Sequence, residues 1–82
     1  MSDAETILEF IRDDLLEEEM EIDADTSLFR DQLLDSMNLT NLIMFLEETF
    51  AIRIGAIDIA FENLDTVNHM IAFIAKKKAA DA

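Results

Sequence analysis

The side chains of this sequence that can do chemistry are few, and the best placed is a serine. Asp35-Ser36 stands directly before a long apolar stretch, and a serine at the start of a helix keeps its hydroxyl exposed. The pair alone is also an ordinary helix cap. The single histidine, His69, falls on the polar side of a predicted helix, which favours a solvated surface residue over a catalytic base.

Other reactive groups are missing from the sequence. It contains no cysteine, which excludes disulfides, thiolate metal sites and a cysteine nucleophile. A calcium loop starting at Asp23 fails, because Leu28 stands where the turn requires glycine and Leu34 where a bidentate glutamate belongs. The sequence has no glycine-rich phosphate loop and no nucleophile elbow. We therefore expect no metal site and no catalysis by this chain alone.

The composition indicates a small folded domain that is strongly acidic. The 82 residues carry a net charge of −13, and 27 of them are Leu, Ile, Val or Phe, too many for a disordered acidic tail. The charge disfavours nucleic acid and anionic membranes and favours basic proteins as partners. No apolar run is long enough for membrane insertion, and the N-terminus is acidic where a signal peptide is basic. We expect a single domain over residues 1–82, monomeric and cytoplasmic.

The acidic residues are unevenly distributed along the chain. Residues 1–35 contain 13 acidic residues against two basic ones, a net charge of −11. Residues 36–82 contain six against four, a net charge of −2. The excess can serve solubility alone, or it can attract basic partners.

The lack of proline and the single glycine favour helices over strands. Ser2 and Glu5 form a capping pair for a first helix, which we expect to end near Leu16–Glu18, because an acidic run is unfavourable at the negative end of a helix dipole. Its inward stripe comprises Ala4, Ile7, Leu8, Ile11 and Leu15. Residues 19–34 form a long loop with a turn at residues 25–27, and its apolar residues, Ile22, Leu28, Phe29, Leu33 and Leu34, are expected to cover the core.

A second helix is predicted from Met37 to Phe50, with Asp35 or Ser36 as its cap. Its inward face comprises Leu39, Leu42, Ile43, Leu46 and Phe50, and its opposite face comprises Met37, Thr40, Asn41, Met44 and Glu48. A short helical segment follows at Ile57–Phe61, and Asp65 or Thr66 caps a last helix. The expected fold is all-α, a small bundle of three main helices plus one short helix.

The stretch around Ser36 resembles the acyl carrier protein family. Asp35-Ser36-Met37 matches the Asp-Ser-Leu/Met signature of that family. Its Leu-x-x-x-Leu-Glu-x-x-Phe continuation is matched by Leu42, Leu46, Glu47 and Phe50. The resemblance extends to residues 26–29, 52–54 and 65–67, so it covers nearly the whole chain.

The resemblance implies that Ser36, with Asp35 as the neighbouring motif residue, receives 4′-phosphopantetheine from coenzyme A through a phosphopantetheinyl transferase. A helix N-terminus suits the resulting phosphodiester, and the prosthetic group supplies the thiol that the sequence lacks. That thiol would hold an acyl or aminoacyl group as a thioester for enzymes of fatty-acid, polyketide or specialised biosynthesis. The chain would be a substrate of its partners and not an enzyme.

The resemblance also implies that the second helix docks on basic patches of acyl- or aminoacyl-loading and acyl-transfer enzymes. Met37 and Met44 would be adaptable apolar contacts, and Glu47 and Glu48 would supply charge. Thr40 and Asn41 complete this predicted partner face, and ordinary solvated surface is the alternative for each residue. A cargo pocket or plain core would account equally for Leu42, Leu46, Ile54, Ile57 and Ile71.

Two departures from the family pattern stand near the serine. Leu34 replaces the glycine that fatty-acid-synthesis carriers have before the Asp-Ser pair, and Asn38 and Asn41 replace acids early in the second helix. Amides lack the charge that steers basic partners, so we expect a carrier of a specialised pathway, similar to D-alanyl or other aminoacyl carriers. The alternative function is an unmodified acidic helical adaptor or inhibitor that binds a basic protein.

Overall fold

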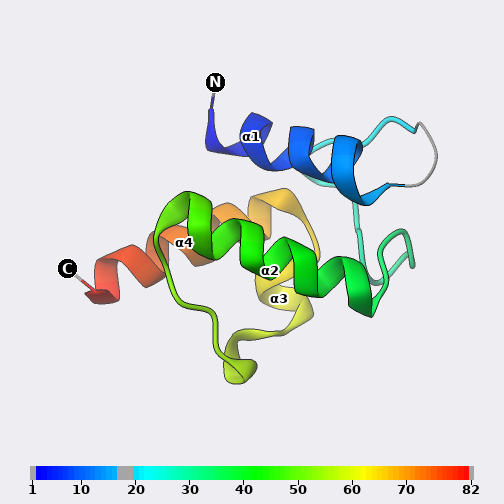
Figure 1. The fold of residues 1–82 in the computed structure, drawn as a ribbon. Helices are drawn as coiled ribbons and strands as arrows, with labels where there is room; N and C mark the ends of the chain where they lie inside the picture. The colour runs from blue at the N-terminus through cyan, green and yellow to red at the C-terminus, as the bar shows by residue number, and fades with distance from the viewer. Residues whose placement is uncertain (1, 17–19, 82) are drawn as a thin grey trace.

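The computed structural model of the chain describes residues 2–16 and 20–81, and helices are its only regular elements over these residues (Figure 1). Helix α1 spans Asp3–Phe10 and continues into a π-helical turn at Ile11–Leu15. Helix α2 spans Ser36–Phe50, and a 3-10 turn covers Ala56–Asp58. Helices α3 and α4 span Phe61–Leu64 and Val67–Asp81. The predicted all-α fold, with three main helices and a long loop after the first, is confirmed.

Helix α1 begins as predicted, because the Ser2 hydroxyl accepts the Glu5 N–H at 3.1 Å. The helix then widens, since the Leu16 N–H donates to the Ile11 carbonyl at 2.9 Å, five residues back. The periodicity predicts one regular helix and misses this π turn. The predicted end at Leu16–Glu18 falls partly on residues 17–19, which lie outside the described residues; the helical backbone ends at Leu15.

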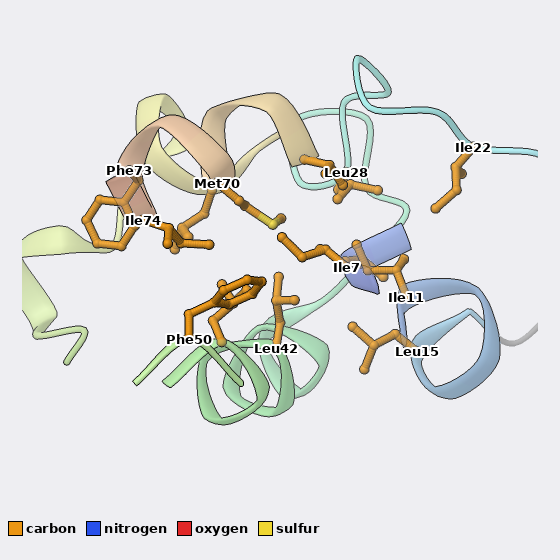
Figure 2. Close-up of a cluster of buried hydrophobic side chains, with 14 of the residues drawn as sticks. Ile7, Ile11, Leu15, Ile22, Leu28, Leu42, Phe50, Met70, Phe73 and Ile74 are labelled. Carbon is orange, nitrogen blue, oxygen red and sulfur yellow. The ribbon is translucent and has the colours of Figure 1, made fainter. Parts of the chain in front are cut away.

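Apolar side chains from the helices and the long loop meet in one core (Figure 2). Ile7 and Ile11 of the first helical segment, Leu42 of α2 and Met70 of α4 are each fully buried. Leu28 of the loop is also fully buried, as its predicted place over the core requires. Burying each such side chain contributes about 1.5–3 kcal/mol, so the loop belongs to the core as much as the helices do.

Two separate short elements replace the single helical segment expected at Ile57–Phe61. The 3-10 turn is fixed by Asp58, whose carboxylate accepts the Gly55 N–H at 3.0 Å and pairs with Lys77 of α4 at 2.8 Å. These contacts lower the pKa of Asp58 below its ordinary value, and the hydrogen bond from Lys77 has the largest effect. Ile57 is 94% exposed, so it belongs neither to the core nor to a cargo pocket.

One buried carboxylate fastens the long loop to the junction of α3 and α4. We call its contacts the Asp65 clamp, and the loop that they hold the clamped loop. Asp65 Oδ1 accepts the N–H groups of Phe29 and Arg30, each at 2.9 Å, and Asp65 Oδ2 accepts the Ser27 hydroxyl. The Asp65 carbonyl accepts the Leu28 N–H at 2.8 Å. The cap of α4 is therefore Thr66, whose hydroxyl accepts the His69 N–H at 3.0 Å; Asp65, the other predicted cap, holds the loop.

The beginning of the loop is held in a similar way by α4. The Asn68 N–H donates to the Ala24 carbonyl at 3.0 Å, and the Asn68 amide donates to the Asp25 carboxylate. Ala24 and Asp25 lie within a turn that begins at Asp23, whose carbonyl accepts the Thr26 N–H at 3.2 Å. This turn begins two residues before the predicted turn at residues 25–27.

Replacing Asp65 removes the acceptor of two partly buried backbone N–H groups. Asp65→Ala is expected to lower the free energy of unfolding by about 2–3 kcal/mol, because the Phe29 and Arg30 N–H groups lose their partner. Urea unfolding of the unmodified protein measures this loss. The exposed neighbour Asp31 is the control, and Asp31→Ala is expected to change stability by less than about 0.5 kcal/mol. Equal losses in the two variants would refute the role of Asp65.

The charge of Asp65 gives the clamp a pH dependence. Burial opposes ionisation, but the hydrogen bonds from Ser27, Arg30 and Phe29 and the Arg30 charge outweigh it, so the pKa of Asp65 lies below 3.8. The stabilisation is therefore complete above the unfolded pKa of 3.8 and is lost as the pH falls through the lower folded value. The difference in free energy of unfolding between the wild type and Asp65→Asn is therefore expected to shrink as the pH falls below 3.8.

Candidate functional site

Ser36 is the first residue of α2, and its position is set by the residues on either side. Asp35 has extended backbone, and its carboxylate accepts the Asn38 N–H at 2.9 Å. The Asn38 side-chain oxygen accepts the Asp35 N–H in return, at 3.1 Å. This reciprocal capping box settles the predicted choice of cap in favour of Asp35. Ser36 itself is exposed, which leaves its hydroxyl accessible to solvent.

The start of α2 can also accommodate a negative charge on Ser36. The first N–H groups of a helix have no acceptor within the helix, and Asp35 satisfies only that of Asn38. The N–H groups of Ser36 and Met37 therefore point outward at the positive end of the helix dipole. A phosphodiester on the Ser36 oxygen would meet these donors, so the residues present fit a phosphate-linked group.

The chain reaches Ser36 through a tight turn on the clamped loop. The Leu33 and Leu34 N–H groups both donate to the Leu28 carbonyl, at 2.9 and 3.0 Å. Leu34 is only 5% exposed and has no left-handed backbone; the positive φ of this turn, 61°, falls on Gln32. The departure from the family's glycine at position 34 thus places an additional side chain in the core.

Asn38, the second departure, also has a structural role. Its amide nitrogen donates to the Leu15 carbonyl at 3.4 Å, while its oxygen belongs to the capping box. An aspartate at this position could accept in the same way but could not donate to Leu15. The amide therefore joins the start of α2 to the end of the π turn, a contact with no signal in the sequence.

Most of the predicted partner face lies on the outer surface of α2. Met37 is 75% exposed and Met44 is 55% exposed, and Thr40, Asn41 and Glu48 are exposed with them. The Thr40 hydroxyl donates to the Ser36 carbonyl at 3.1 Å. Glu47 is only partly exposed, because its carboxylate accepts the Ile54 N–H at 3.0 Å and so holds the segment after α2.

An apolar groove of about 360 Å³ lies between α2, α3 and the clamped loop. It is lined by Phe29, Leu39, Ile59, Ala60, Phe61 and Leu64. The Arg30 guanidinium lies 5.2 Å from the centre of the Phe61 ring. The residues considered for a cargo pocket do not form it, since Leu42 and Leu46 are fully buried in the core. Only the apolar run at residues 57–61 signals this groove in the sequence.

The part of the chain that the structure describes contains no helix with the length and apolar character needed to cross a bilayer. In the same part, no three His, Cys, Asp or Glu side chains are grouped so that they could hold a metal ion.

Comparison with known proteins identifies similar sequences along most of the chain. The family model described as "Phosphopantetheine attachment site" matches residues 5–74. An acyl carrier protein of Solidesulfovibrio magneticus is 38% identical over 78 residues, which are 95% of this chain and 97% of the relative. A D-alanyl carrier protein of Abiotrophia defectiva is 26% identical over 76 residues, 93% of this chain and 96% of the relative.

The cap of α2 makes a direct prediction about stability. Asp35→Ala is expected to lower the free energy of unfolding by about 1 kcal/mol, because the Asn38 N–H loses its acceptor. Asp35→Asn and Asp35→Ser keep a capping oxygen and should retain most of this stability. Thermal unfolding of the three variants tests the assignment, and a loss in Asp35→Ser as large as in Asp35→Ala would contradict it.

Proposed function

Because the chain belongs to the family of phosphopantetheine-binding carrier proteins, we propose that Ser36 is the residue to which its 4′-phosphopantetheine is attached. The observation that supports this most is the position of an exposed serine as the first residue of α2. Ser2 caps α1 and Ser27 donates to the buried Asp65, so the other serines are used by the fold.

The attachment needs little from the chain itself. The Ser36 oxygen attacks the phosphate that bears the pantetheine half of coenzyme A, an O–P bond forms, and the bond from that phosphorus to the nucleotide half breaks. The transferase takes the hydroxyl proton and provides the metal ion. The outward N–H groups of Ser36 and Met37 would be available to the resulting phosphodiester. The prosthetic group supplies the thiol, which a chain without cysteine cannot provide.

The cargo that we propose is an acyl or aminoacyl group held as a thioester and delivered to enzymes of a specialised pathway. The similarity to both an acyl and a D-alanyl carrier supports this range. Asn38 and Asn41 support a partner set different from that of fatty-acid synthesis, because the first turns of α2 lack acidic residues. The absence of cysteine agrees with a cytoplasmic location.

The partner enzymes are proposed to dock on the exposed side of α2. Met37 and Met44 form its apolar contacts, since both are large, exposed and adaptable. Thr40, Asn41 and Glu48 surround them on the same helix. Glu47 contributes charge at the edge of this face while it holds Ile54.

Modification of Ser36 is tested by intact mass measurement after co-expression with a broad-range phosphopantetheinyl transferase. The wild type is expected to gain one phosphopantetheine, and Ser36→Ala is expected to gain none because the acceptor oxygen is missing. Ser2→Ala is the control and should be modified like the wild type. An unmodified wild type, or a modified Ser36→Ala, would refute the assignment.

Docking on α2 is tested by Met44→Glu. Replacing this exposed apolar contact is expected to raise the apparent KM for phosphopantetheine transfer roughly tenfold, as loss of a central interface residue does. The fold should be unaffected, which circular dichroism checks. Ile57→Glu introduces the same charged residue at an exposed apolar position outside α2, and an equal effect of the two variants would contradict docking on α2.

A further inference from the structure

A second surface depression lies between the end of α1 and the outer face of α2. It has a volume of about 290 Å³ and is lined by side chains from both helices, among them Phe10, Asp14, Asn41, Met44, Phe45 and Glu48. We call it the α1–α2 pocket. It takes in half of the predicted partner face, and it adds residues from the acidic first part of the chain.

The floor of the α1–α2 pocket is aromatic. The Phe10 and Phe45 rings are stacked, with centroids 3.9 Å apart and planes at 6° to each other. Both rings are only partly exposed, while the neighbouring Met44 is 55% exposed. This surface suits the methylene stem of a long side chain, which packs on apolar groups while its polar end remains at the rim.

The rim of the pocket carries two carboxylates from different helices. Asp14 comes from the π turn and Glu48 from α2, and both are exposed. The ion pair found among the described residues is elsewhere, between Lys77 and Asp58. Arg12, close to Asp14 in the chain, instead donates to the Ile22 carbonyl at 2.9 Å. The pocket therefore combines an apolar floor with two carboxylates for which the described residues show no ion pair.

We propose that the α1–α2 pocket receives an arginine side chain presented by a partner enzyme, an inference that rests on the proposed carrier function. The guanidinium group is planar and can donate to two carboxylates at once, whereas the ammonium group of lysine is a compact point charge. The methylene stem of the arginine covers the stacked Phe10 and Phe45 rings and Met44. Asp14 thus supplies the docking surface with a negative charge, which Asn38 and Asn41 of α2 do not provide.

The chemistry of the pocket is tested with small probes on the unmodified protein. N-acetyl-arginine amide, N-acetyl-lysine amide and N-acetyl-norleucine amide are titrated into 15N-labelled protein, and backbone amide shifts are followed by NMR. We expect shifts centred on residues 10–14 and 41–48, with arginine binding several-fold more tightly than lysine and norleucine binding least. Shifts that spread over all acidic segments, with equal affinity for arginine and lysine, would overturn the proposal.

The same titration is repeated on two double variants of equal charge. Asp14→Asn with Glu48→Gln should abolish the localised arginine shifts. The matched control, Asp13→Asn with Glu62→Gln, removes the same charge from exposed positions outside the pocket and should retain them. Loss of the shifts in both doubles would show a general effect of net charge and would also overturn the proposal.

Use of the pocket by a partner is measured with the phosphopantetheinyl transferase. The Asp14→Asn/Glu48→Gln variant is expected to show a roughly tenfold higher KM at unchanged kcat, against less than about twofold for the control double. Equal KM values for the two doubles would overturn the docking role. Failure of the carrier function itself is distinguishable, because the wild type would then gain no mass while the arginine titration, which does not involve Ser36, would be unaffected.

Discussion

The buried carboxylate of Asp65 is the interaction on which the rest of the structure depends. It accepts hydrogen bonds from the loop at Ser27, Phe29 and Arg30, and without it these partly buried donors would lose their acceptor. The clamped segment then supports the turn in which the Leu33 and Leu34 N–H groups meet the Leu28 carbonyl. A continuous path of hydrogen bonds therefore joins the start of α4 to the residue that precedes the cap of α2.

The site shows how a carrier can do without catalytic groups. As the proposed attachment residue, Ser36 would need only exposure, a fixed helix start and outward N–H groups, and the capping box of Asp35 and Asn38 supplies the fixed start. Asn38 also reaches the Leu15 carbonyl, so the orientation of α2 is linked to the first helix. The departures from the acyl carrier pattern at positions 34 and 38 are thus parts of this chain's own packing.

Much of this arrangement could be predicted from the sequence, because it follows from local rules. Apolar spacing of three and four residues identifies α1, α2 and α4, and Ser2 and Asp35 mark helix starts by their side-chain chemistry. The contacts of Asp65 could not be predicted, since they join residues about 35 positions apart. Nor could the π turn, the division of residues 56–64 into two short elements, or the presence of Asp14 and Glu48 in one pocket. Each of these depends on how separate segments pack, which periodicity does not encode.

The long sequence separation within the clamp has a consequence for the order of events during synthesis. The loop that leads to Ser36 is held by a residue that follows Ser36 by 29 positions, and closing such a loop is entropically unfavourable until its contacts form. When Ser36 has left the ribosome and Asp65 has not, the serine is exposed before the contacts of Asp65 with the loop can form. If Ser36 is the attachment residue, as proposed, attachment of the prosthetic group would follow folding, and the transferase would meet a completed carrier and not a nascent segment.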